Sequence, residues 1–419
     1  MNLKTFDVHS YRSCQSVKFP LNRDLTGLIG INGSGKTNVL NSIFLLRKIS
    51  EFRFKYANNR DTEYNTCKIG AVFEHNGISI QLKATIYLEM DERNNDEIIS
   101  SDFKWKFSNY NSKEWLTIPI EFFSNQFNSS SFHLPVSIRS NIRFSKGSRG
   151  SFFEIYKLFH TKEFKKNVQP LLHEVFEFIN GINYYSATQF SDPGRCPVSI
   201  ELEEDRFRRR THSSSGHEQF IFDLYNSHKQ NDKEFIRYFN TIGKVGIGLI
   251  DELSFETLPI PSSTYKVRSG GQIKQKNFER QLIVPIFTIN GKKLSPNQLS
   301  EGTFKTLALL YYLITDKSTL LLIEEPEVCI HHGLLDSIIK LLISQSKHKQ
   351  IIISTHSDFV LDHLSPENIL LVKYLETKGT TVKQLSKSMS SDEYRALKMY
   401  LKESGNLGEY AREGGFEYE

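Results

Sequence analysis

The chain has 419 residues, which is more than one compact domain usually holds. Hydrophobic residues make up 38% of it and aromatic residues 12%, which is enough for packed cores and argues against a disordered protein. The net charge of +5 is too small to indicate a nucleic-acid-binding protein by itself. We therefore expect two lobes, or one domain with a large insertion.

Cysteine usage and apolar runs indicate a cytoplasmic protein. The four cysteines include no pair at C-x-x-C spacing, so neither a zinc site nor a disulfide framework is indicated, and a reducing compartment fits. The first residues contain no apolar signal core. The longest nearly apolar run, residues 307–314, is far shorter than the roughly 20 residues that a membrane-spanning helix needs. We therefore expect no membrane contact.

The N-terminal part predicts a strand, a glycine-rich loop and a helix. Residues 25–29 form a short apolar run, and apolar residues recur at helical spacing over residues 36–48. Residues 69–88 predict two strands. Asn76-Gly77, which lies between them, is typical of a hairpin turn.

The middle of the chain predicts loops, helices and strands without an internal repeat. Segments 91–98 and 124–151 are rich in Asn, Ser, Asp and Gly, which predicts loops. Helices are predicted over residues 152–179 and 218–242, and strands over residues 253–289.

A charged stretch between the two helical segments has two interpretations. An acidic run is followed at once by a cluster of arginines: Arg206, Arg208, Arg209 and Arg210. Clustered arginines bind a phosphate backbone through counterion release, so nucleic acid is a candidate partner. The acidic run could instead pair with the arginines internally or dock a protein. A more dispersed basic set is a weaker candidate: Arg139, Arg143, Lys146 and Arg149.

The last third predicts a parallel sheet covered on both faces. A helix that follows residue 303 is apolar all round, which predicts a buried helix. Residues 319–323 and 351–354 are apolar runs without alternation, and a helix is predicted between them over residues 333–345. Strands of this kind separated by helices indicate an α/β fold.

Residues 30–37 read GINGSGKT, which satisfies the pattern G-x-x-x-x-G-K-[ST] in full. Glycines let backbone N–H groups close around a phosphate, and the following helix presents its positive end to the same anion. Lys36 would bridge the β- and γ-phosphates, and the Thr37 hydroxyl would ligate Mg²⁺. A chance match in a glycine-rich turn is the alternative, but the loop stands between a predicted strand and a predicted helix. The expected nucleotide-binding residues are Gly30, Asn32, Gly33, Ser34, Gly35, Lys36, Thr37 and Asn38.

Two carboxylates end the apolar strand at residues 319–323. A buried parallel strand delivers its last residues to the sheet edge where phosphates bind. Glu324 would contact Mg²⁺, directly or through a water, and Glu325 would act as the general base that polarises the attacking water. Solvated acids at a strand end are the alternative interpretation.

Two further motifs lie near these strands. Ser354-Thr355-His356 ends the second buried strand, and a histidine there can sense or stabilise a γ-phosphate, although a structural histidine is the alternative. Residues 299–303, LSEGT, open the apolar helix with a small hydroxyl residue and a glycine, which makes a second anion-binding helix end.

These four elements, in this order, resemble the Walker A loop, signature, Walker B strand and H-loop of ABC-type ATPases. The wording of these four motifs resembles the branch that contains RecF-like and overcoming-lysogenization-defect (OLD-like) ATPases. This branch includes AAA family ATPases of bacterial anti-phage systems such as Septu, PARIS and Gabija. The features shared with that branch are LSEGT at residues 299–303, EEPE at 324–327, STHS at 354–357, YYSA at 184–187 and GNLGEY at 405–410.

The resemblance implies a specific arrangement of two chains. Ser300, Glu301 and Gly302 would contact the γ-phosphate held by a second copy, so that a homodimer sandwiches two ATP molecules with Mg²⁺. Tyr11-Arg12-Ser13 lies where the branch often contacts the base or the phosphates. A glutamine ligand of Mg²⁺ is expected from the middle region, and two candidates remain open: Gln126 and Gln189.

Some sequence features depart from this pattern. Residues 269–272, SGGQ, match the commonest signature wording more closely than residues 299–303, but they lie too far ahead of the acidic strand and predict a loop. Glu324 replaces the usual Asp, which adds a methylene and could shift Mg²⁺. His331-His332 raises the possibility of a metal site, but surface or interface packing is the favoured interpretation. Hydrolysis is therefore expected to be slow, or secondary to ATP binding.

We expect an α/β P-loop NTPase fold: an ABC-type head with a mixed sheet and an inserted helical and β region. Residues 1–150 would form the N-terminal part of the head, with the Walker A loop and a β lobe. Residues 151–290 would form the insertion, and residues 291–419 the C-terminal part with the signature, Walker B strand and H-loop. The resemblance is strong over residues 1–48 and 294–419.

The expected function is a cytoplasmic ATPase that acts as a nucleotide-dependent dimeric switch, or a higher oligomer, and controls an effector in anti-phage defence. His356 is followed by 63 residues (419 − 356), too few for the nuclease domain of some relatives, so a separately encoded nuclease or toxin is expected as the effector. The alternatives are a RecF-like DNA-repair ATPase and an ATP-binding assembly scaffold with little turnover.

Overall fold

The computed structural model describes residues 1–50, 65–90, 96–110, 115–117, 161–203, 216–267, 273–328, 330, 332–403 and 405–416. The chain forms two compact units. The first unit comprises Met1–Tyr184, Ser318–Glu324 and Ser346–Glu419, and the second comprises Tyr185–Lys317 and Glu325–Gln345. No helix within the described ranges is long and apolar enough to span a membrane.

An antiparallel sheet occupies the N-terminal part of the first unit. Its strands follow the order β2-β1-β4-β5-β6-β7. Their bounds are β1 Asn2–Tyr11, β2 Cys14–Pro20, β4 Asn65–His75, β5 Ile78–Met90, β6 Asp96–Phe107 and β7 Leu116–Thr117. The predicted hairpin is confirmed, because Asn76 and Gly77 turn the chain with φ of 49° and 79°.

One loop prediction for this sheet is wrong in part. Residues 96–98 were expected in a loop but belong to β6, which pairs with β5. Pairing with a neighbouring strand outweighs the low β-propensity of acidic residues there. The predicted loop over residues 124–151 lies outside the described residues.

A second, mostly parallel sheet has the order β16-β15-β3-β14-β13-β8. β3 (Leu25–Ile29), β13 (Leu320–Glu324) and β14 (Gln350–Thr355) form its parallel centre, and every residue of β3 and β14 is buried. The remaining strands are β8 Ile182–Ser186, β15 Ile369–Leu375 and β16 Gly379–Gln384. The apolar runs without alternation are explained by this burial, and the predicted α/β fold class is confirmed.

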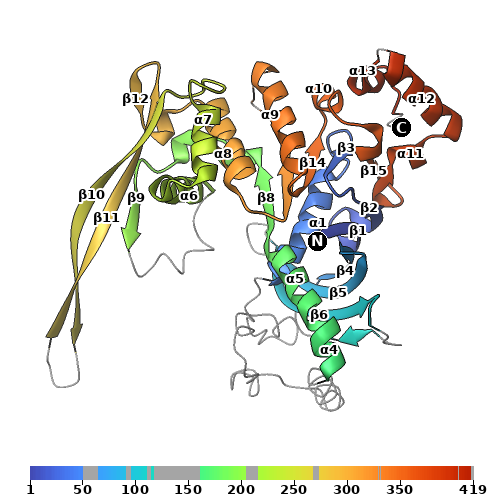
Figure 1. The fold of residues 1–419 in the computed structure, drawn as a ribbon, viewed down its shortest axis with the longest axis horizontal. Coiled ribbons are helices and arrows are strands. Elements are labelled where there is room, and N and C mark those ends of the chain that lie inside the picture. The colour runs from blue at the N-terminus through green and yellow to red at the C-terminus, as the bar shows by residue number, and fades with distance from the viewer. Residues whose placement is uncertain are drawn as a thin grey trace. The chain divides into compact units, whose positions relative to one another are not determined.

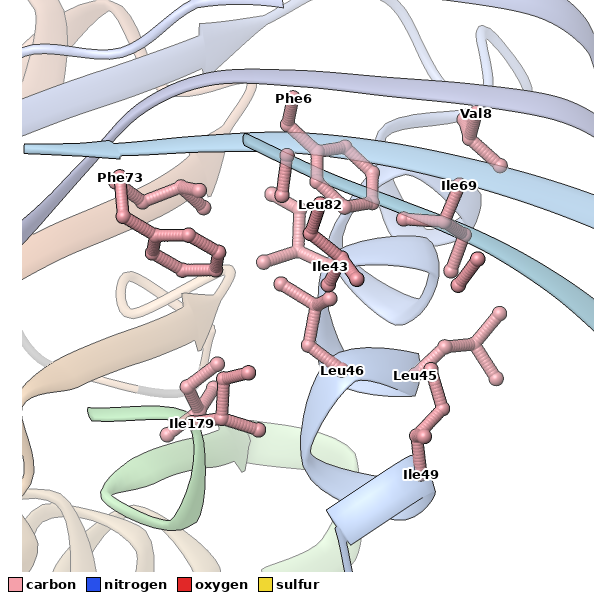
Figure 2. Packing of buried hydrophobic residues seen from close by; sticks show 14 of the residues in the cluster. Phe6, Val8, Ile43, Leu45, Leu46, Ile49, Ile69, Phe73, Leu82 and Ile179 are labelled. Carbon is pink, nitrogen blue, oxygen red and sulfur yellow. The ribbon is translucent and has the colours of Figure 1, made fainter. Parts of the chain in front are cut away.

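The core of the first unit lies between the antiparallel sheet and two helices, α1 (Lys36–Ser50) and α5 (Gln169–Asn180). Figure 2 shows Ile43, Leu46 and Ile179 from these helices pointing toward the sheet residues Phe6 and Leu82. A further short helix, α4 (Lys162–Asn167), precedes α5. Both lie in the predicted helical range 152–179, except that α5 ends one residue later, and residues 152–160 of that range lie outside the described residues. Burial of each large apolar side chain contributes about 1.5–3 kcal/mol, so α1 is firmly seated.

Arg47, in the last turn of α1, ties this helix to the segment after α5. Its guanidinium donates hydrogen bonds to the carbonyl oxygens of Asn180 and Ile182, the second at 3.0 Å, and to Oδ1 of Asn183 at 2.9 Å. These acceptors lie at the end of α5 and at the start of β8. The end of α1 therefore holds the beginning of β8 in place.

The C-terminal part of the first unit contains helices besides β14, β15 and β16. The helices are α10 Asp358–Leu361, α11 Leu385–Ser388, α12 Ser391–Glu403 and α13 Leu407–Arg412. The N–H of Gly408 donates to Oδ1 of Asp362 at 2.7 Å, and a Cβ at Gly408 would collide with the carbonyl oxygen of Asp358. The GNLGEY segment thus docks closely on the helix that follows His356.

The second unit contains three helices that pack through aromatic rings. They are α6 Gly216–Gln230, α7 Lys233–Ile242 and α8 Glu301–Thr315. Phe220 packs on Phe304 and Tyr311 of α8, with ring centroids 5.5 and 5.7 Å apart, and Tyr238 of α7 packs on Tyr311 at 5.4 Å. The predicted burial of α8 is confirmed, with ten of its residues buried.

One helix prediction for this unit is wrong. Residues 218–242 were expected to form one helix, but α6 ends at Gln230 and α7 starts at Lys233. Asn231 takes a left-handed φ of 49°, and the Asp232 side chain accepts the N–H of Phe235 at 2.8 Å as the N-cap of α7. A cap within an otherwise helical pattern ended the helix early.

The rest of the second unit is a β-ribbon with short additions. β10 (Glu252–Val267) and β11 (Ile273–Ile289) pair along their whole length and form the long hairpin in Figure 1. β9 (Ile200–Glu203) and β12 (Lys292–Leu294) pair with β11, and α9 (His332–Ser346) completes the unit. The predicted strands over residues 253–289 and the helix over 333–345 are confirmed.

Replacing Arg47 by Met should destabilise the first unit by about 2–3 kcal/mol, because three partly buried oxygen acceptors lose a charged donor. Both tryptophans, Trp105 and Trp115, belong to this unit, so urea unfolding followed by tryptophan fluorescence reports on it. Lys4→Met is the control, since it removes only the exposed ion pair with Glu74 and should cost less than about 1 kcal/mol. Equal midpoints for the two variants would contradict the role of Arg47.

Replacing Gly408 by Ala should loosen α13, because the new methyl group needs the space of a backbone carbonyl of α10; we expect a loss of about 1–3 kcal/mol. Hydrogen exchange of the amides of α13 measures this directly. Arg412→Ala, which removes only an exposed ion pair with Asp358, should leave the exchange nearly unchanged. Unchanged protection in Gly408→Ala would show that α13 does not depend on this contact.

Candidate functional site

Three neighbouring strands bring predicted site residues to one edge of the parallel sheet. β14 lies between β3 and β13, and all three run parallel. The register pairs Ile29 with Thr355 and Glu324 with Ser354, so the strands end at the same level. The loop at residues 30–37, Glu324 and His356 follow or occupy these ends. The first unit therefore places these three predicted elements on a common edge.

The glycine-rich loop has the backbone shape of an anion nest. Gly33 and Gly35 have φ of 83° and 100°, and Ser34 lies between them without a positive φ. A Cβ at Gly33 would meet nothing within 4 Å, whereas a Cβ at Gly35 would collide with the Thr380 hydroxyl. Alternation of this kind directs successive N–H groups into one concavity, which binds anions.

A lysine and a buried hydroxyl give the same concavity further groups that suit an anion. Lys36 is buried, and its ammonium donates to the carbonyl oxygens of Gly30 at 2.8 Å and Ile31 at 3.1 Å. The Oγ atom of Ser34 is buried and has no hydrogen-bond partner among the residues that the structure describes. A phosphate oxygen would supply the acceptor for Ser34 and the counter-charge for Lys36, so these residues fit a phosphate.

A threonine and a tyrosine hold the carboxylate of Glu324 from two sides. The Thr37 hydroxyl donates to Oε1, and the Tyr184 hydroxyl donates to Oε2 at 2.6 Å. Burial, and then the charge of Glu324, raise the pKa of Tyr184 above its usual range, so Tyr184 remains a neutral donor. An exposed hydroxyl beside a carboxylate is a donor set of the kind that Mg²⁺ takes.

In the sequence, Tyr184 stands out only as part of the YYSA motif, and its contact with Glu324 was not predicted. Tyr184 lies after the predicted helix at residues 152–179, in a segment for which no strand is predicted. β8 joins the sheet next to β13, which carries Glu324. The neighbouring Tyr185 donates instead to the carbonyl oxygen of Lys305 at 3.0 Å and is wholly buried.

A polar network supports the loop from behind. Nδ2 of Asn38 donates to Oγ of Ser13 at 2.6 Å, and Oγ of Ser13 lies 2.7 Å from Oγ1 of Thr380. Thr380 is fully buried and donates to the carbonyl oxygen of Ser34 at 3.1 Å. Asn38 and Ser13, two residues expected to contact the ligand, thus contact the loop's own scaffold, and Thr380 is a support that the sequence did not reveal. Arg12 is exposed and lies over the Tyr11 ring at 5.4 Å.

The two predicted catalytic residues, Glu325 and His356, each directly follow a strand of the parallel sheet. His356 is exposed and directly follows β14. Glu325 directly follows β13 and opens a turn in which the Val328 N–H donates to its carbonyl oxygen at 3.1 Å. Its φ of 46° is left-handed, which is unfavourable for a residue other than glycine. Glu325 belongs to the second unit, and His356 to the first.

The predicted signature residues cap α8 in the second unit. Ser300 is the N-cap, and its exposed side chain accepts the N–H of Thr303 at 3.2 Å. Exposed Glu301 bonds at 2.7 Å to the buried ammonium of Lys305, which lowers the pKa of Glu301. Gly302 is partly buried in the first turn of the helix. The first turn of α8 therefore presents a capped helix N-terminus toward solvent.

Other predicted residues lie apart from this geometry. Gln189 is exposed in the short 3₁₀ helix Ala187–Phe190, and Asn32 is exposed in the loop. His332 is the first residue of α9. The following predicted residues lie outside the described residues: Gln126, Arg139, Arg143, Lys146, Arg149, Arg206, Arg208, Arg209, Arg210, residues 269–272 and His331.

Comparison with known proteins gives one family match. Residues 250–362 match the family described as "AAA domain, putative AbiEii toxin, Type IV TA system". This segment includes Ser300, Glu324 and His356 but not the loop at residues 30–37. No curated protein matches the chain.

Solved structures of SMC head domains show a distant similarity. The SMC head domain from Thermotoga maritima is 13% identical, with a TM-score of 0.40 over 92% of this chain and 99% of that chain. The Smc head domain with an extended coiled coil bound to the C-terminal domain of ScpA, derived from Pyrococcus furiosus, is 13% identical, with a TM-score of 0.41 over 96% and 99%.

The family match and the loop at residues 30–37 come from different parts of the chain and agree with each other. The loop supplies the phosphate nest, and the matched segment supplies the strand that ends in the acidic residues. Residues 250–362 thus resemble an AAA domain, and residues 30–37 add the phosphate-binding loop pattern that P-loop ATPases use.

Proposed function

We propose that this protein binds and hydrolyses ATP with Mg²⁺ at the edge formed by β3, β14 and β13. The observation that carries the proposal is the hydrogen bond from Thr37 to Glu324, which joins the glycine-rich loop to the acidic strand. The backbone N–H groups of the loop and Lys36 would bind the β- and γ-phosphates. Thr37 and Glu324 would ligate Mg²⁺, which supplies charge neutralisation for the departing phosphate.

Glu325 is the proposed general base and His356 the proposed γ-phosphate contact. Glu325 would accept a proton from the attacking water as the bond from that water to the γ-phosphorus forms and the bond to the β-phosphate oxygen breaks. His356 would donate a hydrogen bond to a γ-phosphate oxygen. Glu324 has one methylene more than the aspartate that usually ligates Mg²⁺ there, so we expect slow turnover.

A second copy of the chain is the proposed partner at the γ-phosphate. The exposed Ser300 at the positive end of α8, with Glu301 and Gly302 beside it, suits an anion presented by another molecule. Two chains would then enclose two ATP molecules, and hydrolysis would release them. Such a switch acts on something else only if the dimer and the separate chains bind it with different affinities.

The proposed setting is control of a separately encoded effector in the cytoplasm, in defence against phage. The matching family's description names a toxin of a type IV toxin–antitoxin system, which supports a role beside a second gene product. A nuclease or toxin gene next to this one would favour defence, whereas hydrolysis stimulated by DNA alone would favour a RecF-like repair role.

Lys36→Ala should weaken ATP binding about 10- to 100-fold, because the phosphates lose a charge-assisted donor. Titration with a fluorescent ATP analogue in the presence of Mg²⁺ measures the affinity. Lys378→Ala, a change at an exposed lysine of the β15–β16 turn, is the matched control and should bind as the wild type does. Equal affinity of Lys36→Ala and wild type would refute the phosphate site.

Glu325→Gln should retain ATP binding and lower the hydrolysis rate about 100-fold or more, since removal of a general base costs 10²–10⁴ in rate. The trapped ATP state should accumulate as a dimer, measured by light scattering after size-exclusion chromatography. Adding Ser300→Arg should abolish this dimer, because the side chain would fill the place of the partner's phosphate. Equally slow hydrolysis by wild type and Glu325→Gln would instead indicate a scaffold, and a monomer with bound ATP would contradict the sandwich.

A further inference from the structure

A glutamate at the position of Glu324 raises a positioning problem. Aspartate is the usual Mg²⁺ ligand at the end of this strand. Glutamate has one more rotatable bond, and the torsion of its carboxylate is broad, so the oxygen offered to the metal is less well defined. A second contact to the carboxylate would remove this freedom.

The structure contains such a contact. Oε2 of Glu324 accepts from the Tyr184 hydroxyl at 2.6 Å, while Oε1 accepts from Thr37. The Tyr184 ring packs on Phe44 of α1, with centroids 5.6 Å apart. This packing fixes the ring and therefore also the position of the hydroxyl. Arg47 of the same helix holds the start of β8 through the Ile182 carbonyl.

We propose that Tyr184 is a positioning residue that fixes the rotation of the Glu324 carboxylate, so that Oε1 is presented beside the Thr37 hydroxyl as a ligand for Mg²⁺. This inference rests on the proposed function and goes beyond it. Tyr184 occupies one carboxylate oxygen and directs the other. Tyr184 thereby allows a glutamate to ligate Mg²⁺ where a shorter aspartate is usual.

The neighbouring tyrosine supplies a matched comparison. Tyr185 also donates a hydrogen bond, but to the carbonyl oxygen of Lys305, away from Glu324. Tyr184→Phe and Tyr185→Phe each remove one hydroxyl and keep the ring. If Tyr184 had only a structural role, the two variants would change stability alone.

The test is a titration of Mg²⁺ at a fixed concentration of a fluorescent ATP analogue, with nucleotide affinity as the readout. Tyr184→Phe should keep the affinity measured without Mg²⁺. It should need about 10-fold more Mg²⁺ to reach the half-maximal response, because the loss of partners of a metal ligand typically costs 10- to 100-fold in metal affinity. Tyr185→Phe should respond to Mg²⁺ as the wild type does. Urea unfolding followed by circular dichroism, which reports on the helices of both units, verifies that both variants are folded.

A double-mutant cycle separates positioning from general weakening. In the background of Glu324→Asp the shorter carboxylate loses its reach to the tyrosine, so Tyr184→Phe should shift the Mg²⁺ requirement by less than about 2-fold. The same Mg²⁺ requirement for Tyr184→Phe and wild type would overturn the inference and leave the proposed function standing. A wild-type chain that binds no nucleotide at all would overturn both.

Discussion

The carboxylate of Glu324 is the junction on which the site depends. One of its oxygens accepts a hydrogen bond from the Thr37 hydroxyl at the start of α1, and the other accepts one from the Tyr184 hydroxyl of β8. A carboxylate at the end of a buried strand has a large desolvation cost unless both oxygens are hydrogen-bonded. The Thr37 and Tyr184 hydroxyls meet that requirement. Their hydrogen bonds also connect the glycine-rich loop, the acidic strand and β8.

Helix α1 gives this junction its rigidity, because it is fixed at both ends and along one face. Its first turn carries Lys36 and Thr37, and its last turn carries Arg47, which binds the carbonyls at the start of β8. Between them, apolar residues such as Ile43 and Leu46 pack toward the antiparallel sheet (Figure 2). A site is precise when its side chains stand on elements that packing holds in place.

Much of this arrangement could be predicted from the sequence, because the signals are local. The loop and its helix, the buried strands and the burial of α8 follow from glycine spacing and apolar periodicity. The supports of the site could not be predicted, because they join distant parts of the chain: Tyr184 to Glu324, and Thr380 to Ser13 and Ser34. Periodicity reports which face of an element is buried, not which polar partner it meets.

The backbone at Glu325 helps to distinguish the roles of the two adjacent carboxylates. Glu324 continues β13 and has both oxygens engaged, whereas Glu325 turns out of the strand with a left-handed φ of 46°. That conformation costs an L-residue about 1–2 kcal/mol, and a glycine would adopt it without strain. Stability alone therefore favours glycine at this position. The sequence keeps a glutamate there against that preference, which supports the proposed role of its carboxylate as the general base.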